Sequence, residues 1–300
     1  MLKSLFRRAA CALGLGALLV GAPAAARAPR AAQPALWQVS DADTTIYLFG
    51  TIHLLPEHFQ WRTAKFDEAV QSSQQLVVET IVDEKDPGKI MSVLASLAFN
   101  TPNLPPLLQR VPPDKRAALA AAVKESGFPA QGFDRMETWA AAFILLGNQY
   151  RDMNLKSDEG VEAKLRSSFA SQGKSIGELE TNLQQFSFFD TLPEKAQEAL
   201  LAGAVDESKE ADEEFSGMLK AWSNGDVKAI ARTFDRDLAG SPELAQALIH
   251  RRNANWSRWI EQRMAQPGAL MIAVGAGHLA GKDSVIAMLQ RQGYRVRRVQ

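Results

Sequence analysis

Short apolar runs bounded by turn residues lie at both ends of the chain, and they predict the strands of a sheet. Runs of four to eight residues rich in Val, Ile, Leu and aromatic side chains are typical of buried strands. The last of these runs alternates apolar and charged residues, which predicts a strand near a sheet edge. Strands are therefore expected at residues 36–39, 45–50, 76–79, 175–180, 269–274 and 294–299.

The middle of the chain has a different pattern, which predicts helices. From residue 87 to about 223, good helix formers recur between prolines that punctuate the segments. Ser241 followed by Pro242 is a favourable helix start, so one further helix is expected over residues 241–264. Other helices are expected at residues 67–75, 226–237 and 284–292. These elements predict an α/β (α+β) fold, with a small central mixed sheet and a long, mainly helical insertion.

The first 28 residues have the pattern of a secretory signal peptide. Lys3, Arg7 and Arg8 precede an apolar stretch at residues 10–22, and an Ala-Arg-Ala exit follows at 26–28. The apolar stretch is shorter than the roughly 20 residues that span a bilayer. We therefore expect an exported, periplasmic protein, with an uncleaved signal as its only attachment to a membrane.

The rest of the chain is expected to have two parts, a short flexible start and one domain. Residues 29–35 are rich in Ala, Pro, Arg and Gln, which predicts a flexible start. No strong linker interrupts residues 36–300, so a single domain is expected there.

Charge and cysteine content narrow the possible functions. The chain has 34 basic and 34 acidic residues, and cleavage after Ala28 would remove four basic residues and no acid. The resulting net charge of −4 argues against nucleic acid as a partner. Cys11, the only cysteine, lies in the predicted signal, so the domain has no disulfide or thiolate nucleophile. Phosphate-loop, dinucleotide and Gly-x-Ser-x-Gly motifs are also absent from the sequence.

Two Gly-x-x-His elements occupy matching positions after predicted strands. One runs from Gly50 to His53 and the other from Gly275 to His278. Ligands of α/β proteins bind beyond the carboxyl ends of strands, where glycine allows close backbone approach. Either histidine alone could be a hydrogen-bonded turn residue, but the matched pair favours one shared site.

Two glutamates could complete that site. Glu79 follows a short apolar strand, where it could enter the same crevice or cap a loop, and Glu180 has a similar setting, with Glu178 as an alternative. Histidine and carboxylate ligands suit zinc, manganese or iron, and such an ion can activate bound water. The spacing matches no established metal motif.

A basic pair on the predicted helix 241–264 is the other candidate. Arg252 and its neighbour Asn253 could bind a substrate carboxylate or stabilise developing negative charge. The alternative is a solvated basic patch.

An ordered series of segments resembles the TraB/GumN family and covers nearly all of the expected domain. The segments are YLFGTIH at 47–53, LVVET at 76–80, GVE at 160–162, IGELET at 176–181, RN at 252–253 and VGAGHL at 274–279. This family is related to the Tiki proteins, which are metal-dependent proteases, and more distantly to the erythromycin esterase and ChaN-like folds.

The resemblance implies roles for specific residues. His53 and His278 would be the paired motif histidines, and Glu79 the motif glutamate. Glu180 and the Arg252–Asn253 pair would also belong to the family's site.

Three functions remain open from the sequence. In the first, His53, His278 and Glu79 hold a divalent ion whose water hydrolyses a peptide or small-molecule substrate, with Arg252 stabilising the oxyanion. The second is a binding protein that sequesters a peptide, iron or haem without turnover. The third is a metal-free hydrolase in which His and Glu activate water directly, which the lack of a third nearby histidine keeps open.

Overall fold

A six-stranded mixed sheet forms the centre of the protein, in the order β4-β3-β5-β2-β1-β6. The computed structural model describes residues 31–82, 86–152, 155–205, 208–238 and 241–300, so the predicted signal peptide lies outside the described residues. Strands β4, β3, β5 and β2 are parallel, whereas β1 pairs antiparallel with both β2 and β6. The strands are β1 (Leu36–Ser40), β2 (Thr44–Thr51), β3 (Gln75–Val78), β4 (Ser175–Glu178), β5 (Gly268–Gly275) and β6 (Val296–Arg298).

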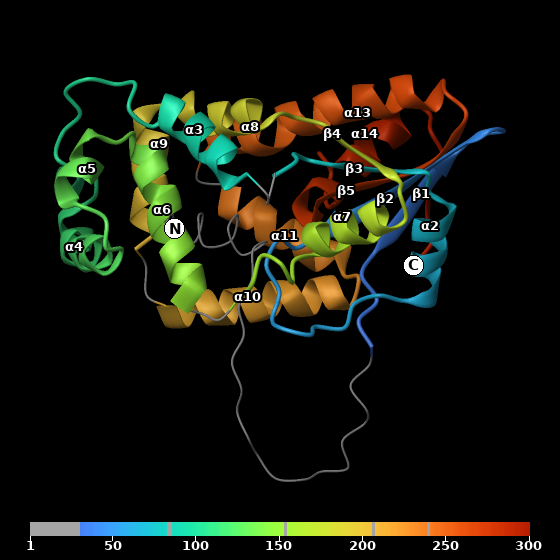
Figure 1. Cartoon of the computed structure of the whole chain (residues 1–300), viewed down its shortest axis with the longest axis horizontal. Coiled ribbons are helices and arrows are strands. Elements are labelled where there is room, and N and C mark those ends of the chain that lie inside the picture. The colour runs from blue at the N-terminus through green and yellow to red at the C-terminus, as the bar shows by residue number, and fades with distance from the viewer. Residues whose placement is uncertain (1–30, 83–85, 153–154, 206–207, 239–240) are drawn as a thin grey trace, which may run out of the picture.

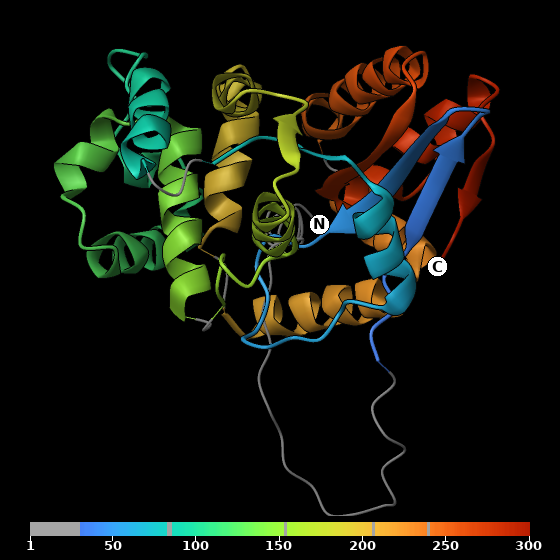
Figure 2. The same cartoon turned by 45° about the vertical axis from the view of Figure 1, so that its right-hand side comes forward.

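Helices cover both faces of this sheet and form a separate group beyond one end (Figure 1). Those near the sheet are α2 (Ala64–Ser72), α7 (Val161–Ser171), α10 (Ser208–Ser223), α11 (Val227–Leu238), α13 (Arg251–Met264) and α14 (Val285–Arg291). Toward the other end of the molecule lie α3 (Pro87–Leu97), α4 (Arg116–Glu125), α5 (Ala130–Arg135), α6 (Thr138–Asp152), α8 (Asn182–Asp190) and α9 (Glu194–Gly203). This arrangement confirms the expected α/β fold with a mainly helical insertion, and the turned view in Figure 2 separates the two parts.

Side chains along the central strands alternate between two cores. Phe49 of β2 and Met271 of β5 pack with α2, α7 and α10, whereas Leu48 and Ile272 pack with α13 and α14. Because successive side chains of a strand point to opposite faces, β2 and β5 must be apolar on both sides. This is why they read as continuous apolar runs in the sequence.

The helical insertion has its own core. Trp139 is fully buried there among residues of α4, α5, α6 and α9. Its indole N–H donates to Asp190 Oδ1 at 3.1 Å, which satisfies the one polar atom of the side chain.

The helix expected at residues 241–264 forms, with one irregular turn. Ser241 caps the start through its hydroxyl, which accepts from the Leu244 N–H. The short α12 (Pro242–Ala245) leads into α13 through η4 (Gln246–His250), a π-helical turn. Such turns are frequent at functional sites. Here the turn ends at His250, two residues before Arg252.

Helix α2 was placed three residues late by the sequence pattern, which predicted it at 67–75. The helix begins at Ala64 because the Thr63 side chain accepts the Phe66 N–H at 3.2 Å. It ends before Ser73, whose backbone returns to an extended conformation to enter β3.

The start of the described chain is held against the domain. Ala32 is buried, and the Gln33 N–H donates to Ser223 O at 2.7 Å. These contacts differ from the flexible start expected at residues 29–35, of which 29 and 30 lie outside the described residues. Within the described ranges, no helix has both the length and the apolar character needed to cross a membrane.

Candidate functional site

The carboxyl ends of the four parallel strands bring the predicted site residues together. Thr51 at the end of β2 pairs with Gly275 at the end of β5, and Val78 of β3 pairs with both Ala273 and Glu178. The segments that follow these strands therefore leave the sheet at the same edge. They carry His53, Glu79, Glu180 and His278.

Arg252 joins the two glutamates in a buried ionic cluster. Its Nη2 lies 2.5 Å from Glu79 Oε2 and 2.8 Å from Glu180 Oε2, and its Nε donates to Glu180 as well. All three residues are at least 93% buried. Arg252 is therefore the counterion of two carboxylates and not the solvated residue that the sequence left open.

Backbone and aromatic donors complete the cluster. Glu79 Oε1 accepts the Gly275 N–H at 2.6 Å, and Glu180 Oε1 accepts the Trp256 indole N–H at 3.0 Å. The Arg252 guanidinium also lies 4.7 Å from the Trp256 ring centre. These contacts hold the side chains of the cluster in place.

The two motif glycines allow close packing at the strand ends. A Cβ on Gly50 would lie 3.0 Å from the Cα of Ala276, and a Cβ on Gly275 would lie 3.2 Å from Glu79 Oε1. A side chain at either position would push these neighbouring atoms away, so glycine is what allows the close approach.

A chain of hydrogen bonds sets the tautomer of His278. Asn253 Nδ2 donates to the Asp283 carbonyl at 2.8 Å, which turns its Oδ1 toward His278 Nδ1 at 2.7 Å. Nδ1 must therefore carry the proton, and Nε2 accepts from Arg252 Nη1 at 3.2 Å. Asn253 orients a neutral His278 in this arrangement.

His53 pairs with a residue that sequence reasoning did not include in the site. Its Nδ1 lies 2.7 Å from Oε1 of Glu162, in the first turn of α7. The Thr51 hydroxyl donates to the same oxygen, and Glu162 Oε2 is buried without a hydrogen-bond partner among the described residues. The sequence did mark segment 160–162 as one of the family-like motifs, but it did not indicate which side chain Glu162 contacts.

The side chain of His53 is 39% exposed, in contrast to the buried cluster. Because Glu162 holds Nδ1, Nε2 is the nitrogen that can face a substrate. A carboxylate that orients an imidazole in this way is typical of groups that transfer protons.

The site pushes the pKa values of its two histidines in opposite directions. Burial would lower the pKa of His53, but the charge and hydrogen bond of Glu162 outweigh it and raise the pKa to about 9. Burial and the nearby Arg252 charge lower the pKa of His278 to about 3. At neutral pH, His53 is the imidazolium and His278 the neutral ring.

The two glutamates also differ. Burial would raise the pKa of Glu79, but Arg252, His278 and His53 outweigh it and lower the pKa to about 2. Burial raises the pKa of Glu180, against the opposing charge of Arg252. Titratable groups whose pKa values are pushed apart are typical of sites with divided acid and base roles.

The arrangement does not fit a divalent metal ion. The described residues include no group of three or more His, Cys, Asp or Glu side chains placed to hold one. The Arg252 guanidinium occupies the position between Glu79 and Glu180, and it faces His278 Nε2, which would otherwise be a ligand atom.

The two remaining histidines lie outside the cluster. The side chains of His58 and His250 are 84% and 41% exposed.

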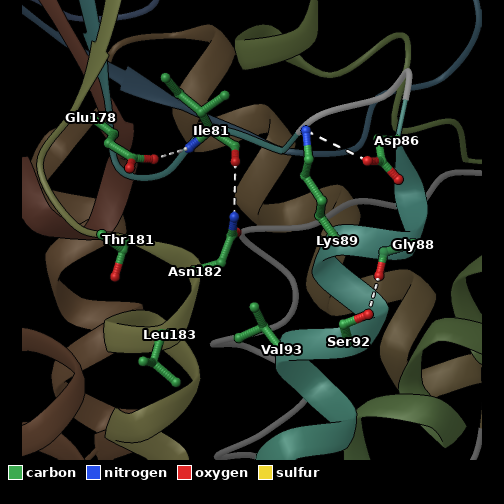
Figure 3. Close-up of a pocket in the computed structure, with 10 residues that line it drawn as sticks. All are labelled: Ile81, Asp86, Gly88, Lys89, Ser92, Val93, Glu178, Thr181, Asn182 and Leu183. Carbon is green, nitrogen blue, oxygen red and sulfur yellow. Dashed lines mark hydrogen bonds and ion pairs between the residues drawn. The ribbon is translucent and has the colours of Figure 1, made fainter.

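An open groove of about 900 Å³ lies between α3 and α8, beside the ends of β3 and β4 (Figure 3). Ile81 and Asn182, two residues beyond Glu79 and Glu180, form part of its wall. The Ile81 N–H donates to Glu178 Oε2 at 2.7 Å, and Asn182 Nδ2 donates to the Ile81 carbonyl at 3.0 Å. The rest of the lining is mixed, with the apolar Val93 and Leu183 beside the polar Asp86, Lys89, Ser92 and Thr181.

Gly160→Ala is expected to destabilise the protein by about 1–3 kcal/mol and to disturb His53. A Cβ at this position would lie 1.8 Å from the His53 carbonyl oxygen, which belongs to the backbone and cannot rotate away. Urea denaturation measures the loss of stability. Gly217→Ala, in α10 with no atom within 4 Å of the added carbon, is the matched control and should retain wild-type stability or gain some. Equal effects of the two substitutions would contradict the close approach at Gly160.

Acidification is expected to destabilise the protein through the buried cluster. The lowered pKa of Glu79 gives stability that is present above its ordinary pKa of 4.5 and is lost as the pH falls toward 2. His278 acts in the same direction, because the unfolded chain binds its proton below pH 6.5 and the folded protein resists it until about pH 3. Thermal unfolding between pH 7 and 3 measures the effect, and His278→Gln should flatten the upper part of the pH dependence. A melting temperature that stays constant across this range would contradict these protonation states.

The fold and site define an α/β protein with two strand-end histidines and a buried Glu-Arg-Glu cluster at one sheet edge. The sequence model of the TraB/PrgY/gumN family matches residues 35–298, and the chain belongs to this family. It is 24% identical over 244 residues to the uncharacterized protein YbaP of Escherichia coli (strain K12), covering 81% of this chain and 87% of YbaP. The YbaP protein of Shigella flexneri matches with the same values. No solved structure matches the chain significantly.

Proposed function

We propose that this protein is a hydrolase of acyl bonds in a peptide or small-molecule substrate, and that its own side chains transfer the protons. The observation that carries the proposal is the His53–Glu162 pair, with Nδ1 held at 2.7 Å and the ring partly exposed. The neighbouring cluster of Glu79, Arg252 and Glu180 supplies fixed charge in a water-poor environment.

His53 acts as the general acid in this scheme. With a pKa raised to about 9 it carries a proton at neutral pH, and Nε2 donates that proton to the leaving group as the acyl bond breaks. The neutral His53 left by that transfer then takes the proton that the attacking water loses, which restores the imidazolium, so water has been added across the bond. Glu79 stays ionised, held by Arg252 and the Gly275 N–H, and supplies fixed negative charge beside this step.

Arg252 has a supporting part. Its guanidinium nitrogens already bond Glu79, Glu180 and His278, so it holds the carboxylates in place and does not serve as the oxyanion donor expected from the sequence. His278 and Asn253 position Arg252 in turn.

The groove between α3 and α8 would bind an apolar part of the substrate. Val93 and Leu183 face each other across it, and the Leu183 residue is 49% exposed (Figure 3). Apolar walls with a few fixed polar groups are typical of small-ligand sites. Leu183→Asp should therefore weaken binding of the substrate more than it slows the reaction.

The experiment is a screen of the purified protein with a quenched fluorescent peptide library and p-nitrophenyl esters, with and without a chelator. Turnover that survives the chelator and disappears in His53→Ala supports the proposal. Elemental analysis accompanies the screen, and one divalent ion per chain that is lost in His53→Ala and His278→Ala would replace it with the metal-dependent mechanism. Tight binding of a peptide or haem without turnover would replace it with a binding function.

We also infer that the protein works outside the cytoplasm. The basic start, apolar stretch and Ala-Arg-Ala exit of residues 1–28 support export. Cell fractionation with sequencing of the mature amino terminus tests this, with Pro29 expected as the first residue of a periplasmic protein. A cytoplasmic protein that keeps Met1 would contradict it.

A further inference from the structure

A second cavity, of about 670 Å³, lies in the helical insertion among η2 (Leu107–Gln109), α4 and α5. Helices α4 and α5 stand at the end of the molecule away from the sheet (Figures 1 and 2). The cavity therefore shares no residue with the site described above. Most of its lining is apolar, from Leu107, Leu108, Ala120, Val123, Phe128 and Phe133.

The apolar walls of this cavity are fixed from several sides. A Cβ on Gly132 would lie 2.4 Å from Phe128 Cε1, so the absence of that atom lets the Phe128 ring lie against α5. The same ring meets Phe133 edge to face, with centroids 5.2 Å apart. The next residue of α5, Asp134, accepts the Leu107 N–H at 2.8 Å through Oδ1 and anchors η2.

Two apolar side chains of this wall, one aromatic and one aliphatic, remain partly exposed. Phe128 is 39% exposed and Leu108 is 40% exposed, at the rim of the same cavity. Preformed apolar cavities of about 300–1,000 Å³ are typical of small-ligand sites. An apolar chain is the ligand that this lining would solvate best, because it covers Phe128 and Leu108 without leaving a polar group unpaired.

The charged side chains that line the cavity determine which head group an apolar ligand would carry. Asp134 and Lys124 are both exposed there; the Asp134 carboxylate accepts the Leu107 N–H through Oδ1, whereas Lys124 lies in the last turn of α4, at the rim. An anionic head group would be complementary to Lys124 while its chain enters the cavity. We propose that the helical insertion binds an anionic single-chain amphiphile, of the fatty-acid class, at this cavity. This site is independent of the proposed hydrolysis.

Calorimetric titration of the purified protein with laurate, below the concentration at which laurate forms micelles, tests the proposal. Laurate should bind, and dodecyltrimethylammonium, with the same chain and a cationic head, should bind roughly fivefold more weakly or not at all. Lys124→Glu should weaken laurate roughly fivefold and strengthen the cationic amphiphile.

A second variant tests whether the hydrocarbon chain of laurate lies in the cavity. Gly132→Ala displaces the Phe128 ring and should weaken laurate roughly tenfold. Gly147→Ala, in α6 with no atom within 4 Å of the added carbon, is its control and should bind as the wild type does. Absence of laurate binding to the wild type overturns the proposal, as does binding that Lys124→Glu leaves unchanged. If Gly132→Ala fails to fold, the charge-reversal variant decides alone.

Discussion

Arg252→Met is expected to lower the free energy of unfolding by about 3–5 kcal/mol at pH 7, the range for breaking a buried ion pair from one side. The substitution keeps an unbranched side chain of helix-compatible shape but removes the charge that Glu79 and Glu180 share. Both carboxylates would then remain buried, and the donors left to them among the described residues would be the Gly275 and Trp256 N–H groups and a long contact from Gln185. Urea denaturation of the variant and the wild type measures the difference.

The pH dependence of this loss identifies its cause. Without Arg252, burial would raise the pKa of Glu79 above its ordinary value, so the folded variant would bind more protons than the unfolded chain. The difference in free energy of unfolding between the variant and the wild type would therefore narrow as the pH falls toward 5. Glu79→Gln introduced into Arg252→Met should recover part of the lost stability at pH 7, because the amide removes one unpaired buried charge.

Arg251→Met is the matched control for Arg252. It removes the same charge from the neighbouring position of α13, where the side chain is exposed, and should change stability by less than about 0.5 kcal/mol. If Arg252→Met costs no more than Arg251→Met, the guanidinium is not the counterion of the buried carboxylates.

His53→Ala is expected to reduce kcat/KM by roughly 10²–10⁴ on a substrate found in the proposed screen, the usual contribution of a general acid or base. The loss should appear in kcat more than in KM, because the proton is transferred in the transition state and not on binding. His58→Ala is the matched control, five residues away with its side chain 84% exposed, and should keep wild-type activity. Equal activities of the wild type and His53→Ala would remove His53 from the reaction.

Glu162→Gln separates positioning from a purely structural role. In the wild type, activity should fall above about pH 9, as His53 loses the proton that it donates. Because Glu162 is the cause of the raised pKa, the amide should move this alkaline limb to lower pH, toward or below the ordinary value of 6.5. A limb that stays near pH 9 in Glu162→Gln would show that the pair does not set the protonation of His53.

The sequence by itself determined the elements and the two motif positions. Continuous apolar runs in β2 and β5 predicted buried strands, because a strand covered on both faces has no polar side. The Gly-x-x-His elements lie at the ends of those strands, where the last strand residues are Thr51 and Gly275, since their glycines and the strand ends are local features. Membership of the TraB/PrgY/gumN family, suggested by the ordered motifs, is confirmed over residues 35–298.

Only the tertiary structure decided which of these residues touch. Glu162 meets His53 across 109 positions of the chain because α7 packs on the sheet beside the end of β2, and nothing local to either residue specifies that contact. The Glu79–Arg252–Glu180 cluster depends on the strand order β4-β3-β5 and on the placement of α13 over it. The sequence gives the type of each side chain, but its partners and its burial follow from long-range packing. These two properties set the protonation of His53 and His278.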